Sequence, residues 1–177
     1  MFAKLLKGAP LHNTNAAKDH HHTGAVDYSN LKNMPSSIEG VSIEKKLLSS
    51  PTMLAIGGSS GIALNTSRKA AVAWKDMAEY QKKAFASGWS SSDHPNHVIW
   101  HELAHVKVKN DLSTTVNSSL TNLNSNNPTF KKLALKVSTY AAKNGHEFLA
   151  EVFAAKRSGR TLDDDVLKYY DFLGGPK

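Results

Sequence analysis

His101-Glu102-Leu103-Ala104-His105 is the stretch that decides how the rest of this chain is interpreted, because it has the pattern H-E-x-x-H. On a helix, residues four apart lie on the same face, so both imidazoles can reach one metal ion. Glu102 lies beside the first histidine, where it can reach a water on that metal and act as a general base. The motif therefore predicts a metal site, provided that it lies on a helix and that a third ligand exists.

The residues on either side of the motif predict that helix. Ser92 or Asp93 is a suitable N-cap and Pro95 suits a first helical turn. Apolar side chains recur at helical spacing over residues 96–109, and Asn110 is a suitable C-cap. Both histidines should then lie on the buried side of one helix.

Two short apolar runs upstream predict a β-hairpin. They cover residues 52–56 and 61–65 and are joined by a Gly/Ser turn. The hairpin could be a small core sheet, or it could offer an edge along which a peptide substrate lies, and both can be true together. Residues 38–50 are expected to form a short helix and residues 69–86 an amphipathic one.

The C-terminal third is expected to be helical. Residues 111–127, rich in Ser, Thr and Asn, predict a loop or a poorly formed helix. Three further helices are expected. The first begins at Pro128, with Asn127 as its cap and an apolar stripe to Ala141. The second covers residues 146–157, and the third covers residues 162–172 after a Thr161-x-x-Asp164 capping box.

Length and composition predict one domain. The chain has 177 residues, of which 40% are hydrophobic, enough for a single core. Residues 1–35 are rich in Gly, Pro and polar residues and are expected to form an irregular arm, leaving residues 36–177 as the folded domain. The stretch from Asp19 to His22 contains three consecutive histidines; it is interpreted as a solvated loop, with a weak metal site or an expression remnant as alternatives.

Charge and hydropathy restrict the partners. The chain lacks cysteine, so a metal must be held by histidine or oxygen ligands. The formal net charge of +7 is interpreted as a solubility bias, because no arginine-rich stripe with interleaved aromatics predicts specific reading of nucleic acid. No apolar run approaches the length of a membrane span, and the basic segment at residues 1–11 is a poor secretory signal. A cytoplasmic or virion-associated protein without a membrane partner is expected.

The third ligand should come from the helix expected over residues 146–157. A catalytic zinc ion takes three protein ligands and keeps one open position. His146, Glu147 and Glu151 are the candidates, and the two glutamates lie four apart on one helical face. Phe148 and its apolar neighbours indicate a largely buried helix, where two carboxylates are costly unless they are paired or bind a metal.

At this point the sequence resembles a known family. Residues 140–154, with the pattern Tyr-x6-Glu-Phe-x-Ala-Glu-x-Phe, resemble the second zinc-binding segment of gluzincin metallopeptidases of the anthrax lethal factor type, and are similar to zincin domains attached to phage proteins. The resemblance covers roughly residues 52–157 and is strongest over residues 98–105 and 140–154. One departure is Ala104, where the family often has glycine.

The resemblance implies a fold, a cofactor and roles for individual residues. It implies an α+β, mainly helical zincin-like domain with a small sheet next to the H-E-x-x-H helix. His101, His105 and Glu147 would bind Zn2+, Glu102 would be the general base, and Tyr140 would face the substrate oxyanion. Glu151 would lie behind the ligands and fix the orientation of a ligand histidine.

Three functions remain open from the sequence. The first is a zinc-dependent endopeptidase that acts on a peptide or protein substrate. The second is a zincin-fold structural or assembly part of a phage particle, partnered by phage structural proteins and with weak or specialised proteolysis. The third is a basic binding protein in which the motif arose by chance. Metal content separates the third from the others, and cleavage of a peptide library separates the first from the second.

Overall fold

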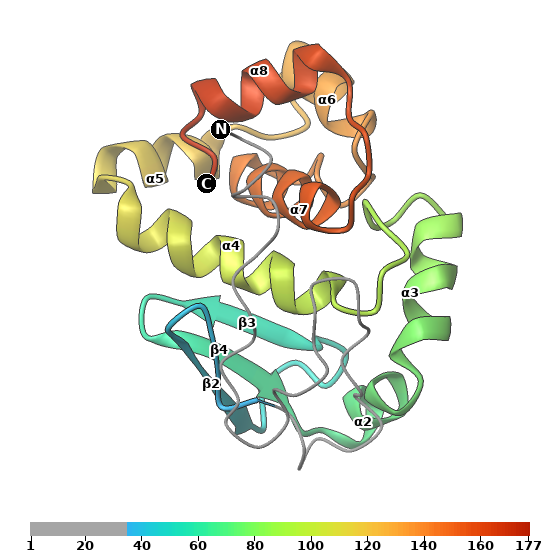
Figure 1. Ribbon diagram of the computed structural model, residues 1–177. Coiled ribbons are helices and arrows are strands. Elements are labelled where there is room, and N and C mark those ends of the chain that lie inside the picture. The colour runs from blue at the N-terminus through green and yellow to red at the C-terminus, as the bar shows by residue number, and fades with distance from the viewer. Residues whose placement is uncertain (1–34) are drawn as a thin grey trace.

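The computed structural model describes residues 35–177, which form an α+β fold with a small sheet and a larger helical part (Figure 1). The sheet has four strands in the order β1-β2-β4-β3. β2 and β4 are parallel, and the two outer pairs are antiparallel. The strands are β1 (Ser37–Ile38), β2 (Val41–Lys46), β3 (Ala55–Gly58) and β4 (Gly61–Asn65). The irregular arm expected over residues 1–35 and the Asp19–His22 stretch lie outside the described residues, except for buried Pro35.

The expected helix over residues 38–50 is wrong, because this segment forms β1 and β2. Glu39 and Gly40 both have positive φ, at 49° and 79°, which suits a tight two-residue hairpin turn. Ile43 of β2 pairs with Ile62 of β4 and is buried, while its neighbours on β2 are exposed. The pairing with β4 therefore decides the conformation of a segment whose local pattern is ambiguous.

The β-hairpin expected over residues 52–65 is confirmed. β3 pairs with β4 from Ala55 opposite Leu64 to Gly58 opposite Gly61, so the turn falls on Ser59 and Ser60. Ile62 and Leu64 are fully buried. This hairpin forms the side of the sheet that lies against the H-E-x-x-H helix.

The predicted helix over residues 69–86 is two helices, α2 (Arg68–Lys75) and α3 (Met77–Ala86). Asp76 lies between them with φ −138° and ψ 65°, outside the helical region. Its side chain accepts a hydrogen bond from the Glu79 backbone N–H and so caps α3. An aspartate that caps a new helix interrupts the apolar periodicity less visibly than a glycine or proline would.

The helix that carries the motif is confirmed as α4 (His97–Asp111). Its N-cap is Asn96, without a side-chain capping bond, rather than Ser92 or Asp93, and it runs through Asn110 to Asp111. The Ser/Thr/Asn-rich segment contains a formed helix, α5 (Thr114–Asn122), which Ser113 caps through its side chain.

The remaining helices are α6 (Pro128–Leu135), α7 (Gly145–Arg157) and α8 (Asp164–Phe172). Asn127 caps α6 as predicted, but α6 ends at Leu135 and not near Ala141. Asp163, rather than Thr161, precedes α8, and it makes no side-chain capping bond. Within residues 35–177, none of these helices has the length and apolar character of a membrane span.

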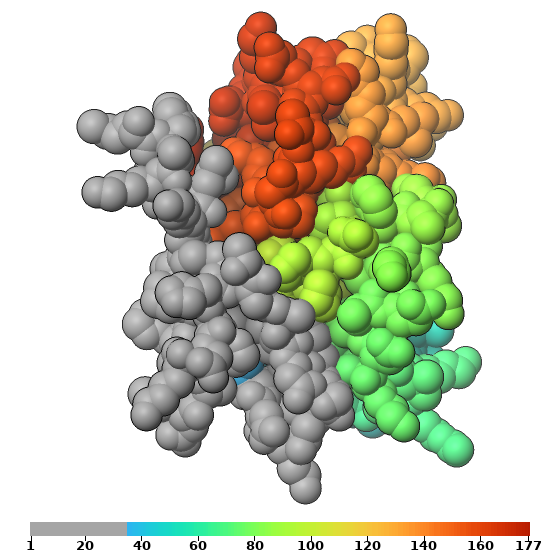
Figure 2. All heavy atoms as spheres, turned by 45° about the vertical axis from the view of Figure 1, so that its right-hand side comes forward, coloured from blue at the N-terminus to red at the C-terminus, as the bar shows by residue number. Residues whose placement is uncertain are grey.

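α4 is the central layer of the fold. One face packs on the hairpin of β3 and β4, and the opposite face packs on α7 (Figure 1). One buried apolar cluster fills the space between the sheet, α2 and α4, and a second lies between α7 and the helices α5, α6 and α8. In the space-filling view, part of α4 remains visible between the C-terminal helices and the α2–α3 segment (Figure 2).

Candidate metal centre

The centre is built where α4 and α7 face each other. α4 presents His97, His101 and His105, which are spaced four apart and so lie on one face. α7 presents Glu147 and Glu151, also four apart. All five residues therefore lie along a single helix–helix contact, the most extensive between two helices of the described chain.

Local sequence sets the start of α7 and hence the position of its glutamates. The side chain of Asn144 accepts a hydrogen bond from the Glu147 N–H at 3.0 Å and caps the helix. Gly145 follows, where a Cβ would lie 2.9 Å from the Leu120 carbonyl oxygen. The absence of a side chain at Gly145 lets α5 pack closely against the first turn of α7.

His101, His105 and Glu147 form one group that could share a metal ion. His101 Nε2 lies 2.9 Å from Glu147 Oε2 and 3.0 Å from His105 Nε2. His105 Nε2 lies 3.3 Å from the same Glu147 oxygen. The three candidate ligand atoms thus converge from two helices on one point.

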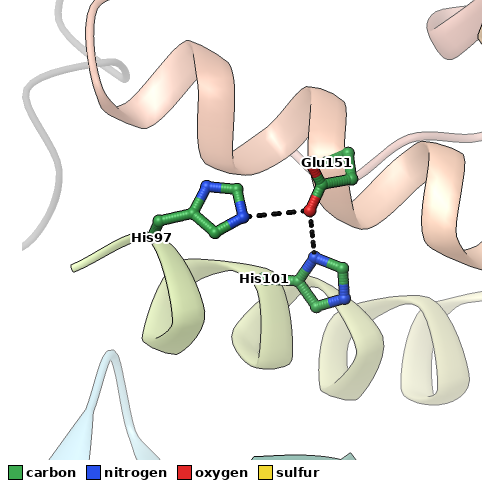
Figure 3. Close-up of side chains that lie close together, drawn as sticks. All are labelled: His97, His101 and Glu151. Atoms are coloured by element: carbon green, nitrogen blue, oxygen red, sulfur yellow. Dashed lines mark hydrogen bonds and ion pairs between the residues drawn. The ribbon is translucent and has the colours of Figure 1, made fainter. Parts of the chain in front are cut away.

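His97, His101 and Glu151 form a second group, and this buried group could also hold a metal ion. Figure 3 shows the two imidazoles of α4 pointing at one oxygen of Glu151 on α7. Glu151 Oε1 lies 2.9 Å from His97 Nε2 and 2.8 Å from His101 Nδ1. His101 belongs to both groups, using Nδ1 for Glu151 and Nε2 for Glu147.

Glu151 is saturated by donors within the protein. Its second oxygen, Oε2, accepts hydrogen bonds from the Ser91 N–H at 2.6 Å and from the Ser138 hydroxyl at 2.9 Å. With two partners on each oxygen, the carboxylate has no free acceptor position. A bond from the Nδ1–H of His101 to Glu151 leaves the Nε2 lone pair of the neutral ring directed at Glu147 and His105.

Proton affinities at the centre reflect these bonds. Burial lowers the pKa of His101, but its hydrogen bonds to Glu147 and Glu151 outweigh burial and raise this pKa to about 10. Burial raises the pKa of Glu147, yet its bonds with His101 and His105 bring that pKa well below the usual value. Burial likewise opposes ionisation of Glu151, while His97 and His101 hold its pKa well below the usual range. Without a metal, a proton on His101 supplies the positive charge between the two carboxylates.

Glu102 contacts the sheet beside the candidate ligands. Its Oε2 accepts a hydrogen bond from the Gly57 N–H at 2.5 Å, and Lys109 donates to the Gly57 carbonyl at 2.8 Å. A Cβ on Gly57 would lie 2.3 Å from the Glu102 carbonyl oxygen and 3.0 Å from His105 Cβ. Glycine at position 57 therefore permits β3 to approach the motif closely.

Tyr140 lies in the segment between α6 and α7, not near the end of a long helix as expected. Its backbone N–H donates to the Trp89 carbonyl at 3.1 Å, and Thr139 donates to Gly88 at 2.8 Å. The Tyr140 ring has its centroid 5.5 Å from that of His101 and 5.0 Å from that of Trp89. Burial raises the pKa of the Tyr140 phenol, with a further contribution from Glu147 and Glu102, so the hydroxyl remains a donor at neutral pH.

Sequence reasoning did not identify His97, although it lies four residues before His101 and continues the same helical face. The four-residue spacing between His97 and His101 could have identified His97 from the sequence. The contributions of Ser91 and Ser138 to Glu151 had no such signal, because these residues come from separate loops. His146, one of the three candidates for the third ligand, instead bonds through Nε2 to the Asn117 carbonyl at 2.9 Å.

No protein-family model matches the chain, and comparisons with curated proteins and with solved structures find no match either. The function is therefore argued from the geometry of the centre.

Proposed function

We propose that this protein is a zinc-dependent endopeptidase with a zincin-like centre. One observation carries the proposal: His101 Nε2, His105 Nε2 and Glu147 Oε2 lie 2.9 to 3.3 Å from one another. Three ligand atoms of a tetrahedral zinc ion, bound at about 2.0–2.1 Å, are separated by about 3.3 Å. The observed spacing fits that requirement with small side-chain movements.

The group of His101, His105 and Glu147 suits the ion better than the group with His97. Glu151, the acidic member of the second group, already accepts four hydrogen bonds and is 1% exposed. Glu147 is partly exposed, as is His105, so the first group leaves room for a water and a substrate. Glu151 then serves to hold His101 in the ring orientation that a ligand needs.

A zinc ion in this group would lower the pKa of a bound water toward neutrality and polarise the substrate carbonyl. Glu102 follows the first ligand histidine and lines the same cleft as His101. Its carboxylate would accept a proton from the attacking water and pass it to the leaving amine. Tyr140 also lines the cleft, and its phenol would donate a hydrogen bond to the oxyanion as charge develops.

A pair of histidine variants tests the site, because each histidine belongs to one group only. Zinc should be bound at about one ion per chain, measured by elemental analysis. His105→Ala should lose the ion, while His97→Ala should retain it with reduced affinity. Cleavage of a mixed peptide library should require zinc, stop with chelator and return on zinc addition. Loss of zinc in His97→Ala but not in His105→Ala, or a zinc-loaded protein that cleaves no peptide, would contradict the proposal.

A further inference from the structure

A cleft of about 510 Å³ lies beside the centre; His101 and Glu102 are in its wall, whereas His105 and Glu147 are not. α3 and α4 form two of its sides, and the segments around Trp89 and Tyr140 form another. Met53, Tyr80 and Trp89 are exposed large side chains of this wall. Exposed apolar and aromatic surface of this kind, next to a reactive centre, suits the side chain of a bound peptide.

Lys143 places a positive charge on this wall. Its Nζ lies 4.0 Å from the ring centroid of Tyr140 and 5.1 Å from that of Trp89. The side chain is exposed, and within residues 35–177 no carboxylate lies within ion-pair distance of it. Two aromatic faces hold the ammonium in place while its N–H groups remain available to another acceptor.

The other charges of the cleft do not compete for that ammonium. Glu102 and Glu151 are the only carboxylates among the described residues that line the cleft. Glu102 accepts from the Gly57 N–H, and Glu151 is saturated by Ser91, Ser138, His97 and His101. The Lys143 ammonium is therefore open to a carboxylate of a bound molecule, which would replace water at its N–H groups.

We propose that Lys143 makes the cleft selective for peptides in which a carboxylate lies close to a large apolar or aromatic residue. This inference rests on the proposed function, since it assigns a substrate class to the same site. The apolar side chain contacts Met53, Tyr80 and Trp89, and the carboxylate pairs with the Lys143 ammonium. A lysine at the acidic position would instead meet a like charge.

The reach of Lys143 limits where the carboxylate lies. The Lys143 Nζ lies 4.0 Å from the Tyr140 ring centroid, which lies 5.5 Å from the His101 ring centroid, so the ammonium is within about 9.5 Å of the His101 ring. An extended peptide advances about 3.3–3.6 Å per residue. The acidic residue therefore lies within about three residues of the bond that faces the centre.

Peptide binding to the full-length, zinc-loaded Glu102→Gln variant tests the selectivity without turnover. The peptides are blocked at both ends and contain one Phe in an Ala/Gly background, with Asp at one of three positions on either side and Asn counterparts. Binding is followed by tryptophan fluorescence, because Trp89 is exposed whereas Trp74 and Trp100 are buried. The same titrations in a Trp89→Phe background assign the signal to the cleft.

At least one Asp peptide should bind roughly three- to fivefold more tightly than its Asn counterpart, the scale of one largely exposed ion pair. The preference should shrink in 1 M salt, where the Debye length is about 3 Å. Lys143→Met should remove the preference, whereas Lys132→Met, which changes an exposed lysine of α6 outside the cleft, should retain it.

Equal affinity for every Asp and Asn pair, absence of binding by all peptides, or a preference that survives Lys143→Met would overturn the inference. Cleavage by the zinc-loaded parent protein is measured separately. If the parent cleaves peptides without preferring Asp over Asn, the role of Lys143 is contradicted and the proposed function is retained. If Asp peptides bind more tightly but the parent cleaves none of them, the proposed function is contradicted, and Lys143 selects the ligands of a peptide-binding site.

Discussion

Glu151→Gln is the substitution that most directly tests how the centre is held together. Glutamine preserves the volume of this 1% exposed side chain but replaces one carboxylate oxygen by an NH2 group. If the amide oxygen stays with His97 and His101, the NH2 group faces the Ser91 N–H and the Ser138 hydroxyl. The hydroxyl can rotate to accept, but the backbone N–H cannot.

Two effects of different size follow from this geometry. One buried donor without a partner costs about 1–3 kcal/mol of folding free energy. Loss of the carboxylate that orients a ligand histidine weakens metal binding about 10- to 100-fold. We therefore expect Glu151→Gln to fold with reduced stability and to bind zinc about 10- to 100-fold more weakly than the parent protein.

Zinc affinity is measured by competition with a chromophoric chelator, and stability by urea unfolding of the metal-free protein. Ser138→Ala is the matched control, because it removes one partner of Glu151 Oε2 and leaves the Oε1 bond to His101 intact. It also removes the acceptor of the buried Ala141 N–H, so it should lower stability by about 1–3 kcal/mol. Its zinc affinity should stay within about threefold of the parent value. A Glu151→Gln variant that is destabilised but binds zinc as tightly as the parent would refute the orienting role.

Three further predictions concern the residues around the ion. Glu102→Gln should keep zinc and abolish peptidase activity, because an amide cannot accept the proton of the water; equal rates of cleavage would contradict this. Tyr140→Phe should keep fold and zinc but lower kcat about 10- to 1000-fold with little change in KM, which steady-state kinetics can measure. In the metal-free protein, the pKa of His101 is raised from 6.5 to about 10, so protonated His101 stabilises the fold fully below pH 6.5 and this stabilisation is lost as the pH rises toward about 10. The pKa values of Glu147 and Glu151 are lowered, so these carboxylates stabilise the fold only above about pH 4.5. Urea unfolding should therefore show this contribution at its largest between about pH 4.5 and 6.5, and an unfolding free energy whose His101 contribution is unchanged from pH 6.5 to 10 would contradict the assignment.

Local sequence determined the elements that carry the candidate ligands. The four-residue spacing of His101 and His105 needs only a helix to bring both rings to one face, and the apolar pattern around them predicts that helix. Asn127 and Pro128 begin α6 through the local chemistry of a cap and a fixed φ. The Gly/Ser turn between two apolar runs predicts β3 and β4 for the same kind of reason.

Contacts between distant segments decided the rest. Val41–Lys46 became a strand because it pairs in parallel with β4, a partner about 20 residues further along the chain by the register Ile43 to Ile62. Tyr140 lies beside His101 because its backbone bonds to Trp89, and Glu151 joins His97 to His101 only once α7 packs on α4. Hydrogen-bond partners from separate elements leave no periodic trace in the sequence, so only the tertiary structure could reveal that Ser91 and Ser138 donate to the Glu151 carboxylate.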